Sequence, residues 1–177
     1  SAAQPADPAA ARLHVPDGFA LNTYTTGLRA PRLMTVGPDG NLYVAETGAG
    51  AVVRLQDANG DGVADAREVV AANLPGAHSV EWHDGDLYVA TYNRIVRLTD
   101  TNGDGDFLDE GEQNTVTDNI PTGGNHVTRT LHFGPDGKLY VAAGSSSNNS
   151  PESDRRRATI MRFNIDGTIP EDNPFAN

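Results

Sequence analysis

The chain has 177 residues, which is enough for one domain with a hydrophobic core. Its 24 acidic residues outnumber its 13 lysines and arginines and give a formal net charge of −11, so nucleic acid is excluded as an expected partner. The absence of cysteine excludes disulfides and thiol chemistry, and no apolar run of about 18 residues is present that could span a membrane.

The N-terminal residues 1–14 are rich in Ala and Pro and are expected to form a disordered segment. Such a segment is typical of the start of a mature exported chain, and equally of a linker remnant, and no signal peptide is recognisable in it. Further on, apolar and polar residues alternate from Phe19 to Thr26, and this alternation predicts a β-strand.

A four-residue motif, Leu-Tyr-Val-Ala, occurs three times in the chain, beginning at Leu42, Leu87 and Leu139. Each copy follows a short apolar run and a turn that contains Asp-Gly. A repeat of about 40–50 residues built from short strands and tight turns is typical of β-propellers. The sequence therefore predicts an all-β chain that contains about three blades of a propeller.

Residues 15–177 are predicted to form this partial propeller, with blades at about 31–73, 77–118 and 126–177. A six-bladed ring needs roughly 270 residues at ~45 residues per blade, so the chain supplies half of such a ring. Strand 19–26 is then the expected ring-closing strand. The fourth strand of the third blade is not evident; the other strands are expected at 32–36, 41–46, 51–55, 68–72, 79–82, 86–91, 94–98, 114–117, 130–133, 138–143 and 159–164.

The segment Asp57–Glu68 matches the calcium-binding loop of EF-hand proteins. Acidic or amide side chains stand at its first, third, fifth, ninth and twelfth positions, a glycine stands at the sixth, and the seventh offers a backbone carbonyl. Hard oxygen ligands at this spacing wrap one Ca²⁺, and the alternative interpretation is an Asp- and Gly-rich turn without metal. The predicted ligands are Asp57, Asn59, Asp61, Val63, Asp65 and Glu68.

The segment Asp100–Glu112 repeats the first half of this pattern, again between the third and fourth strands of its blade. Its twelfth position is Gly111, so the loop is one residue longer or is closed by another acidic residue near its end. This recurrence predicts that both calcium sites brace the outer edges of the blades, away from a central pocket. The predicted ligands are Asp100, Asn102, Asp104, Asp106, Asp109 and Glu112, with Glu110 as an alternative.

The inner strands of a propeller line its central channel, and the residues where they begin project toward its mouth. Alignment of the repeats places Arg32, His78 and Arg129 at equivalent positions, and His126 lies shortly before Arg129. Two arginines and two histidines would form a cationic, proton-accepting mouth that suits an anionic ligand such as a carboxylate-bearing quinone. The alternative interpretation is that the arginines bond loop carbonyls and that the histidines are ordinary hydrogen-bonded residues.

Three stretches, Arg32–Glu46, His126–Asn148 and Ile160–Pro174, resemble the glucose/sorbosone dehydrogenase family. Members of that family are soluble six-bladed β-propeller quinoproteins that use pyrroloquinoline quinone (PQQ). The resemblance covers nearly the whole chain from Val15 onward, and its most specific parts are the stretch that begins at His126 and the Ile-Pro-x-Asp-Asn-Pro ending. The chain resembles the N-terminal half of such an enzyme.

The resemblance implies a PQQ-dependent dehydrogenase that oxidises an aldose, a sorbosone-like sugar or another aldehyde by hydride transfer to the quinone. It implies that His126 is the catalytic base, which takes the proton from the anomeric hydroxyl of a sugar while hydride passes to the C5 carbonyl of PQQ. A periplasmic or secreted location is also implied. The predicted cofactor-binding residues are Arg32, His78, Arg129, Ser145 and Asn149.

The sequence departs from the family pattern at two points. An aspartate orients the catalytic histidine in the glucose-oxidising members, whereas Ser145 stands at the matching position here and favours the sorbosone-dehydrogenase branch. Further PQQ ligands belong to later blades, so a complete site requires the missing propeller half or a second copy of the chain. Two other classes stay open: a non-catalytic, calcium-stabilised half-propeller, and a lactonase-type hydrolase, which is disfavoured because it needs carboxylates at the mouth.

Overall fold

The computed structural model describes residues 13–173 and consists there of three antiparallel β-sheets without a helix, which confirms the predicted all-β partial propeller. The sheets contain four, four and three strands in chain order. Their bounds are β1 (Pro31–Val36), β2 (Leu42–Glu46), β3 (Ala51–Gln56) and β4 (Ala66–Ala71); β5 (Ser79–His83), β6 (Asp86–Ala90), β7 (Ile95–Leu98) and β8 (Gln113–Thr117); β9 (Arg129–Phe133), β10 (Leu139–Ala143) and β11 (Thr159–Phe163).

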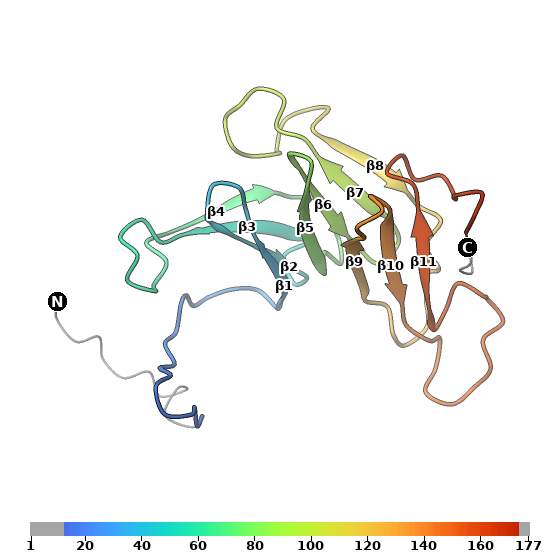
Figure 1. The fold of residues 1–177 in the computed structure, drawn as a ribbon, viewed down its shortest axis with the longest axis horizontal. Helices are drawn as coiled ribbons and strands as arrows, with labels where there is room; N and C mark the ends of the chain where they lie inside the picture. Colours follow the sequence, from blue (N-terminus) through green and yellow to red (C-terminus); the bar gives the residue numbers. More distant parts are fainter. Residues whose placement is uncertain (1–12, 174–177) are drawn as a thin grey trace.

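Consecutive strands pair within each sheet, and the three sheets stand side by side as successive blades. The innermost strands β1, β5 and β9 are neighbours, and Figure 1 shows the outer strands fanning away from them. The amide of Leu33 in β1 donates to the carbonyl of His78 just before β5 at 3.0 Å. The Ser79 hydroxyl in β5 lies 3.3 Å from the amide nitrogen of Leu131 in β9. The beginnings of the inner strands are thereby fixed at one end of the molecule.

Tight turns join the two innermost strands of each blade. The β5–β6 turn consists of Asp84 and Gly85, whose φ angles of 49° and 89° are those of a type I′ hairpin turn. In the first blade residues 37–41 join β1 to β2, and the amide of Gly37 donates to the Asn41 carbonyl at 2.8 Å. Gly40 lies in that loop at φ 81°, a conformation that favours glycine.

The tyrosine of the repeat is built into the turn that precedes it. The Tyr43 hydroxyl donates to the Asp39 carboxylate at 2.9 Å, and Tyr140 donates to Asp136 at 3.0 Å. A Cβ added to Gly37 would lie 2.4 Å from the Tyr43 ring, so glycine is required beneath that ring. The recurring Gly-Pro-Asp-Gly-x-Leu-Tyr motif is therefore one structural unit that consists of a turn and the strand after it.

Aromatic side chains fill the spaces between neighbouring blades. Between the first two blades, Tyr43 and Trp82 meet edge to face with ring centroids 5.1 Å apart, and Phe107 lies beside Trp82. Between the second and third, Tyr88 meets Phe133 edge to face at 4.7 Å. Such pairs add to the apolar area that is buried, so the blades are held together by packing rather than by shared strands.

The strand predicted at 19–26 is not present in the structure. The segment runs as irregular chain over the outward face of the first blade, where Tyr24 and Leu28 pack near Val53 and Leu55. One backbone bond fixes it there, from the Ala64 amide to the Tyr24 carbonyl at 2.8 Å. A ring-closing role for this segment stays a prediction.

The strands of the three blades end within two residues of their predicted bounds. The described part of the third blade has no fourth strand, in keeping with the lack of a signal for one. The predicted disordered segment 1–14 lies outside the described residues except for its last two positions. Within residues 13–173 no helix is long and apolar enough to cross a membrane.

Candidate active site

His126 is exposed in the loop that leads into β9, and one residue of the loop after β10 holds its ring. The His126 Nδ1 atom lies 3.1 Å from the carbonyl oxygen of Ser145 and 2.9 Å from its hydroxyl oxygen. A carbonyl oxygen only accepts hydrogen bonds, so Nδ1 of the neutral ring carries the proton. The lone pair is then on Nε2, the nitrogen that can accept a proton from a ligand.

These two loops approach each other so closely that their contact requires glycine. A Cβ added to Gly144 would lie 2.5 Å from the Cβ of His126, and one added to Gly124 would lie 2.8 Å from the Cα of Ser146. The amide of Asn125 donates to the Ser146 carbonyl at 2.8 Å. The histidine therefore stands on a loop whose backbone is fixed against its neighbour.

Arg129, the first residue of β9, is buried beneath the His126 loop with 1% of its surface exposed. Its guanidinium donates to the carbonyls of Pro121, Thr128 and His126, the last two at 2.8 and 3.1 Å. The sequence suggested that Arg129 faces a cofactor. Its observed contacts instead follow the alternative interpretation, in which an arginine bonds loop carbonyls.

Arg157 precedes β11 and holds the same loop from another direction. It is 7% exposed, and its guanidinium donates to the carbonyls of Thr122 and Gly123, the latter at 2.6 Å. Sequence analysis missed Arg157 because it is the last of three successive arginines, and the run carries no signal that tells the buried one from its neighbours. Two segments far apart in sequence thus immobilise the residues around His126.

Arg129 and Arg157 bring two positive charges into the interior, and neither forms an ion pair with a carboxylate in the described part of the chain. Burial, followed by the charge of Arg157, lowers the pKa of Arg129, which still remains protonated at neutral pH. The buried Nε of Arg129 and Nη1 of Arg157 also lack hydrogen-bond partners among the described residues. This unbalanced positive charge favours an anion at the mouth.

His78 and Arg32 extend the site across the inner strands. The His78 Nδ1 atom lies 3.0 Å from the Arg129 carbonyl oxygen, so this ring too carries its proton on Nδ1 when neutral. Burial lowers the pKa of His78, and the charges of Arg32 and Arg129 lower it further, against the opposing effect of its backbone hydrogen bond. Arg32 is exposed at the start of β1, and no side chain in residues 13–173 pairs with it.

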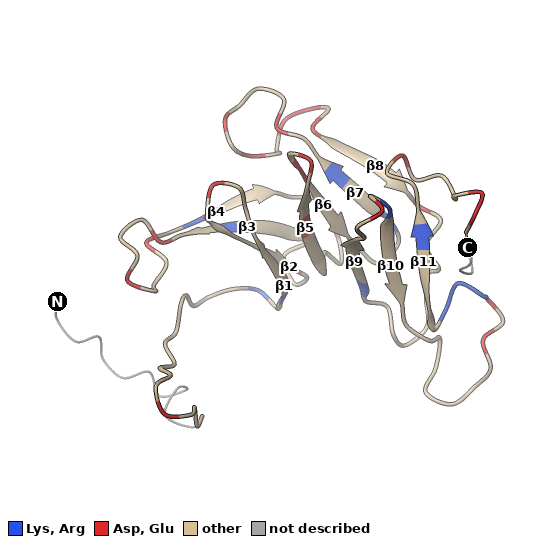
Figure 2. Cartoon of the chain, viewed as in Figure 1, with Lys and Arg blue, Asp and Glu red and all other residues tan. Residues whose placement is uncertain are grey.

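The structure thus brings most of the predicted site residues together. Hydrogen bonds run from His78 to Arg129, from Arg129 to His126 and from His126 to Ser145, and the charge of Arg32 acts on His78. Figure 2 shows that basic residues at the beginnings of β1 and β9 lie at the same end of the sheets. Asn149 is exposed in the loop after β10, and no described contact joins it to this cluster.

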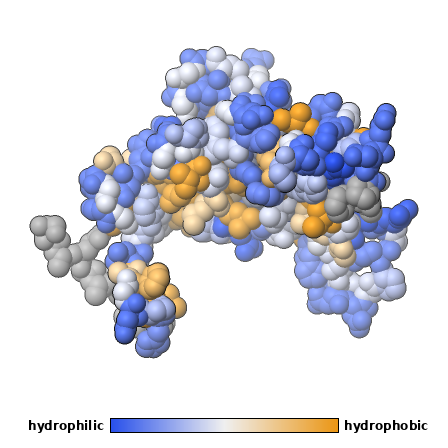
Figure 3. Space-filling view, viewed as in Figure 1, coloured by the Kyte–Doolittle hydropathy of each residue, from blue (hydrophilic) through white to orange (hydrophobic). Residues whose placement is uncertain are grey.

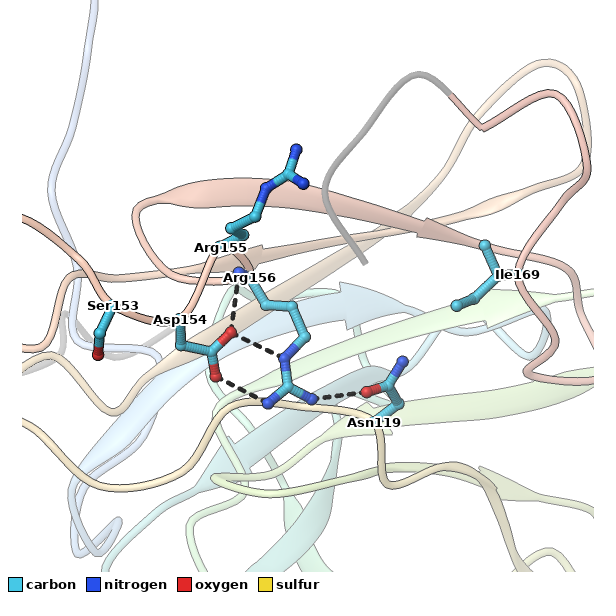
Figure 4. Close-up of a pocket in the computed structure, with 6 residues that line it drawn as sticks. All are labelled: Asn119, Ser153, Asp154, Arg155, Arg156 and Ile169. Carbon is cyan, nitrogen blue, oxygen red and sulfur yellow. Dashed lines mark hydrogen bonds and ion pairs between the residues drawn. The ribbon is translucent and has the colours of Figure 1, made fainter.

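The loop that supplies Ser145 and Arg157 is stiffened by an ion pair. Arg156 Nη2 lies 2.7 Å from Asp154 Oδ2, and this neighbour lowers the pKa of Asp154 to about 2. Figure 4 shows Arg156 between Asp154 and Asn119 along one side of an open hollow of about 530 Å³, while Arg155 points away from that pair. The charge of Arg156 is satisfied within the loop.

The first acidic loop closes on itself. Asp57 accepts hydrogen bonds from the amides of Gly60 and Gly62 at 2.8 and 2.9 Å, and Asn59 donates to Asp65 at 3.2 Å. Asp61 Oδ1 in turn accepts from the amide of Val63 at 3.0 Å. Glu68 stands apart on β4, where it pairs with Arg54 of β3 at 2.5 Å. Five of the six predicted ligands therefore lie in one folded loop and the sixth is engaged elsewhere.

The second acidic loop is anchored to the first blade, where Arg54 donates to the Gly105 carbonyl at 3.0 Å and the Phe107 amide donates to the Val70 carbonyl at 2.7 Å. Glu112 is buried and accepts from the amides of Thr101 and Asp109 at 2.9 and 3.2 Å. The amides of Gly103 and Gly105 donate to Asp100. Hydrogen bonds also join Asn102 to Asp104 and to Asp109, and Asp106 accepts from the Leu108 amide. Within residues 13–173, no three His, Cys, Asp or Glu side chains are grouped in an arrangement that would hold a metal ion.

Residues 5–172 match a family described as a domain of unknown function, DUF7133. A pyrroloquinoline quinone-dependent sugar dehydrogenase of Hypocrea jecorina is 29% identical over 90% of this chain and 39% of its own length. Quinoprotein glucose dehydrogenase B of Acinetobacter calcoaceticus is 22% identical over 91% of this chain and 42% of its own length. The chain thus spans about two fifths of the length of these curated relatives.

Solved structures of similar proteins agree with the fold. A calcium structure of a Trichoderma reesei carbohydrate-active enzyme of family AA12 superimposes with a TM-score of 0.72 at 28% identity, covering 90% of this chain and 41% of that one. The PQQ-bound form of an aldose sugar dehydrogenase from Streptomyces coelicolor gives a TM-score of 0.67 at 26% identity, covering 88% and 50%. The resemblance to PQQ-dependent sugar dehydrogenases extends from the repeat motifs to the arrangement of the blades.

Proposed function

This chain belongs to the DUF7133 family, and from the site that it carries we propose that it supplies the proton-accepting part of a PQQ-dependent sugar or aldehyde dehydrogenase. The observation that carries the proposal is the His126–Ser145 contact, which leaves Nε2 of an exposed imidazole as the acceptor. The relatives named above, PQQ-dependent sugar dehydrogenases, support the same reaction class.

The donors at the mouth fit a quinone that bears carboxylates. Arg32 is exposed and unpaired in the described part, and the buried charges of Arg129 and Arg157 lie behind the His126 loop without a carboxylate partner. Arg32 and His78 would hold the cofactor in this chain, with Ser145 and Asn149 beside it. When bound, PQQ supplies the electron-pair acceptor of the oxidation.

The role proposed for His126 is to take a proton from the hydroxyl group of the substrate. A histidine suits this task because its ordinary pKa lies close to neutral pH. The Ser145 carbonyl accepts a hydrogen bond from Nδ1, which keeps the proton on that nitrogen, and Arg129 donates to the backbone carbonyl of His126. Both contacts fix the orientation of the imidazole ring and therefore of Nε2. Ser145 in place of an aspartate favours a sorbosone-like or other aldehyde substrate over glucose.

Three further parts of the proposal concern the surroundings of the site. The remaining blades come from the missing propeller half or from a second copy of the chain. In this proposal calcium binds the loops Asp57–Glu68 and Asp100–Glu112 and braces the blade edges. Glu68 would leave its ion pair with Arg54 and coordinate the metal instead. The location is periplasmic or secreted, as the resemblance implies.

The test compares His126→Asn and His126→Ala with the wild type in the assembled propeller. Asparagine can keep a hydrogen bond to the Ser145 carbonyl but cannot act as a base, so both variants should lose about 10²–10⁴-fold in kcat while PQQ binding changes little. Reduction of a dye acceptor measures turnover, and absorbance titration measures PQQ binding. Arg32→Ala should instead weaken PQQ binding. Near-wild-type turnover of His126→Asn in a PQQ-loaded assembly would contradict the assigned base.

A further inference from the structure

A second hollow adjoins the candidate active site on the side of the second blade. It has a volume of about 460 Å³, within the usual range for small-ligand pockets. One of its walls belongs to the His126 loop, since Val127 follows the histidine directly and lines the hollow. The residues that line it are Pro75, Tyr92, Asn93, Thr122, Gly123 and Val127.

Tyr92 is an exposed aromatic ring held in a defined position. It lies in the turn between β6 and β7, which is closed by the Thr91 amide donating to the Arg94 carbonyl at 2.9 Å. Its ring packs on the backbone of Gly76, where an added Cβ would be 2.3 Å from ring atoms and where φ is +75°. Tyr92 as a residue is nevertheless 38% exposed, so part of its surface remains available to a ligand.

The polar groups of the hollow are few and neutral. The Asn93 side chain accepts a hydrogen bond from Thr91 through Oδ1, and in the described part of the chain its amide nitrogen has no acceptor. Across the hollow, Arg157 bonds the carbonyls of Thr122 and Gly123 and so fixes that wall. The guanidinium itself is turned to those carbonyls and does not line the hollow.

This lining selects the chemistry of the occupant. None of the six lining residues carries a charge, so an anionic quinone finds no counterion here. An aromatic face with an amide and a hydroxyl at its edge matches a neutral ring that has apolar C–H faces and a hydroxyl rim, which is the chemistry of a hexopyranose.

We propose that the Tyr92 hollow is a carbohydrate subsite, which binds a hexopyranose unit of an oligosaccharide next to the unit that reaches His126. The ring of that unit lies on Tyr92, and its hydroxyls bond the Asn93 amide and the Thr122 hydroxyl. The proposal deepens the proposed function and rests on it for the sugar that reacts. It predicts that oligosaccharides bind more tightly than monosaccharides.

The experiment is a binding measurement on the chain itself, by amide NMR titration with glucose, maltose and cellobiose. At least one disaccharide should shift the signals of Tyr92, Asn93 and Val127 and bind about tenfold more tightly than glucose, equivalent to about 1.4 kcal/mol. Tyr92→Ala should abolish that preference. Tyr92→Phe, the matched control, should keep most of it because it retains the ring face.

The result that overturns the subsite is equal binding of disaccharides by the wild type and Tyr92→Ala, or no disaccharide-dependent shift at the hollow. Because binding is read without PQQ, failure of the proposed dehydrogenase activity leaves this outcome intact. The converse also holds. If the PQQ-loaded enzyme is active on monosaccharides but its binding of disaccharides does not depend on Tyr92, the proposed function stands and the subsite is wrong.

Discussion

Ser145 orients His126 mainly through an atom that every residue possesses. The backbone carbonyl at 3.1 Å is sufficient to keep the proton on Nδ1, and the hydroxyl at 2.9 Å adds a second contact. The replacement of a carboxylate by serine at this position therefore does not remove the orientation of the ring. Compared with the aspartate that the family resemblance implies there, serine lacks a negative charge beside the imidazole, so in the proposed reaction the imidazolium would be stabilised less.

Sequence analysis could identify His126, His78 and Arg32 because the repeat fixes where inner strands begin. The same alignment placed Arg129 correctly but gave it a cofactor-facing role, and Arg157 was missed, because the partners of both are backbone carbonyls of an irregular loop. Any residue type can supply a carbonyl, so such contacts leave no pattern of spacing or charge. The loop conformation that aims the carbonyls inward is a property of the folded chain.

His78 should make stability depend on pH. Its pKa in the folded chain is below the ordinary value of 6.5, so the unfolded chain binds its proton more readily. The stabilisation by neutral His78 is therefore present above the unfolded-state pKa and is lost as pH falls through the folded-state pKa. His78→Asn keeps a donor for the Arg129 carbonyl and does not titrate, so its melting temperature should decline less on acidification.

The comparison is made by thermal unfolding of the two proteins from slightly alkaline to acidic pH. The difference between the two curves isolates His78, since the other titrating groups are shared. If the curves of wild type and His78→Asn remain parallel below pH 6.5, the lowered pKa of His78 is wrong.

At the scale of secondary-structure elements, strands were predictable where a turn motif fixed their ends. The Pro-Asp-Gly and Asp-Gly turns set the register of β1 with β2 and of β5 with β6, and the repeated apolar runs set the rest. Segment 19–26 shows the limit of this reasoning, because alternation gives a strand only where another strand edge is within reach. The second acidic loop shows another limit: it carries Phe107 into the core between two blades, which its composition did not indicate.

Calcium should stabilise the chain through the first acidic loop. The Asp57 carboxylate accepts hydrogen bonds from the amides of Gly60 and Gly62, so the loop is already folded around the side chain at its first position. Calcium at about 100 times its Kd would add about 2.7 kcal/mol to the free energy of unfolding. Asp57→Asn keeps an oxygen for the amides but lowers the negative charge, and should lose most of this gain.

The measurement is the melting temperature of both proteins with Ca²⁺ and with a chelator. Asn41→Ala, a substitution in a turn outside both acidic loops, is the control and should keep the full calcium response. If the melting temperature of the wild type is the same with Ca²⁺ and with chelator, the two loops are turns that do not bind calcium.

For the whole molecule, the outer side of the third blade exposes apolar surface that is buried at the equivalent place in the first blade. In the first blade the paired residues Ala45 and Val52 face the second blade and are fully buried. Their equivalents in the third blade are the paired residues Ala142 and Ile160, and Ile160 is 48% exposed. Figure 3 shows that hydrophobic residues are exposed over the first blade as well.

The chain should therefore associate, with a second copy or with the remaining blades. Full burial of Ile160 is worth about 1.5–3 kcal/mol, and Ile160→Lys would place a charge in that interface. We expect the wild type to gain mass with rising concentration in light scattering and Ile160→Lys to remain monomeric. Leu108→Lys, at a residue that is 49% exposed on the second acidic loop, should behave as the wild type. A wild type that stays monomeric at high concentration contradicts self-association.

The clamp of Arg157 on the His126 loop also orders events during synthesis. A ribosome releases the chain from its N-terminal end, and domains fold as they emerge. Blades one and two contain all their own strands, and these strands precede residues 144–157 in the chain, so we expect both blades to form before that segment leaves the exit tunnel. The loop that bears His126 emerges earlier than the arginine that holds Thr122 and Gly123. We therefore expect the loop that bears the proposed proton acceptor to be fixed late, once Arg157 has emerged and bonds its carbonyls.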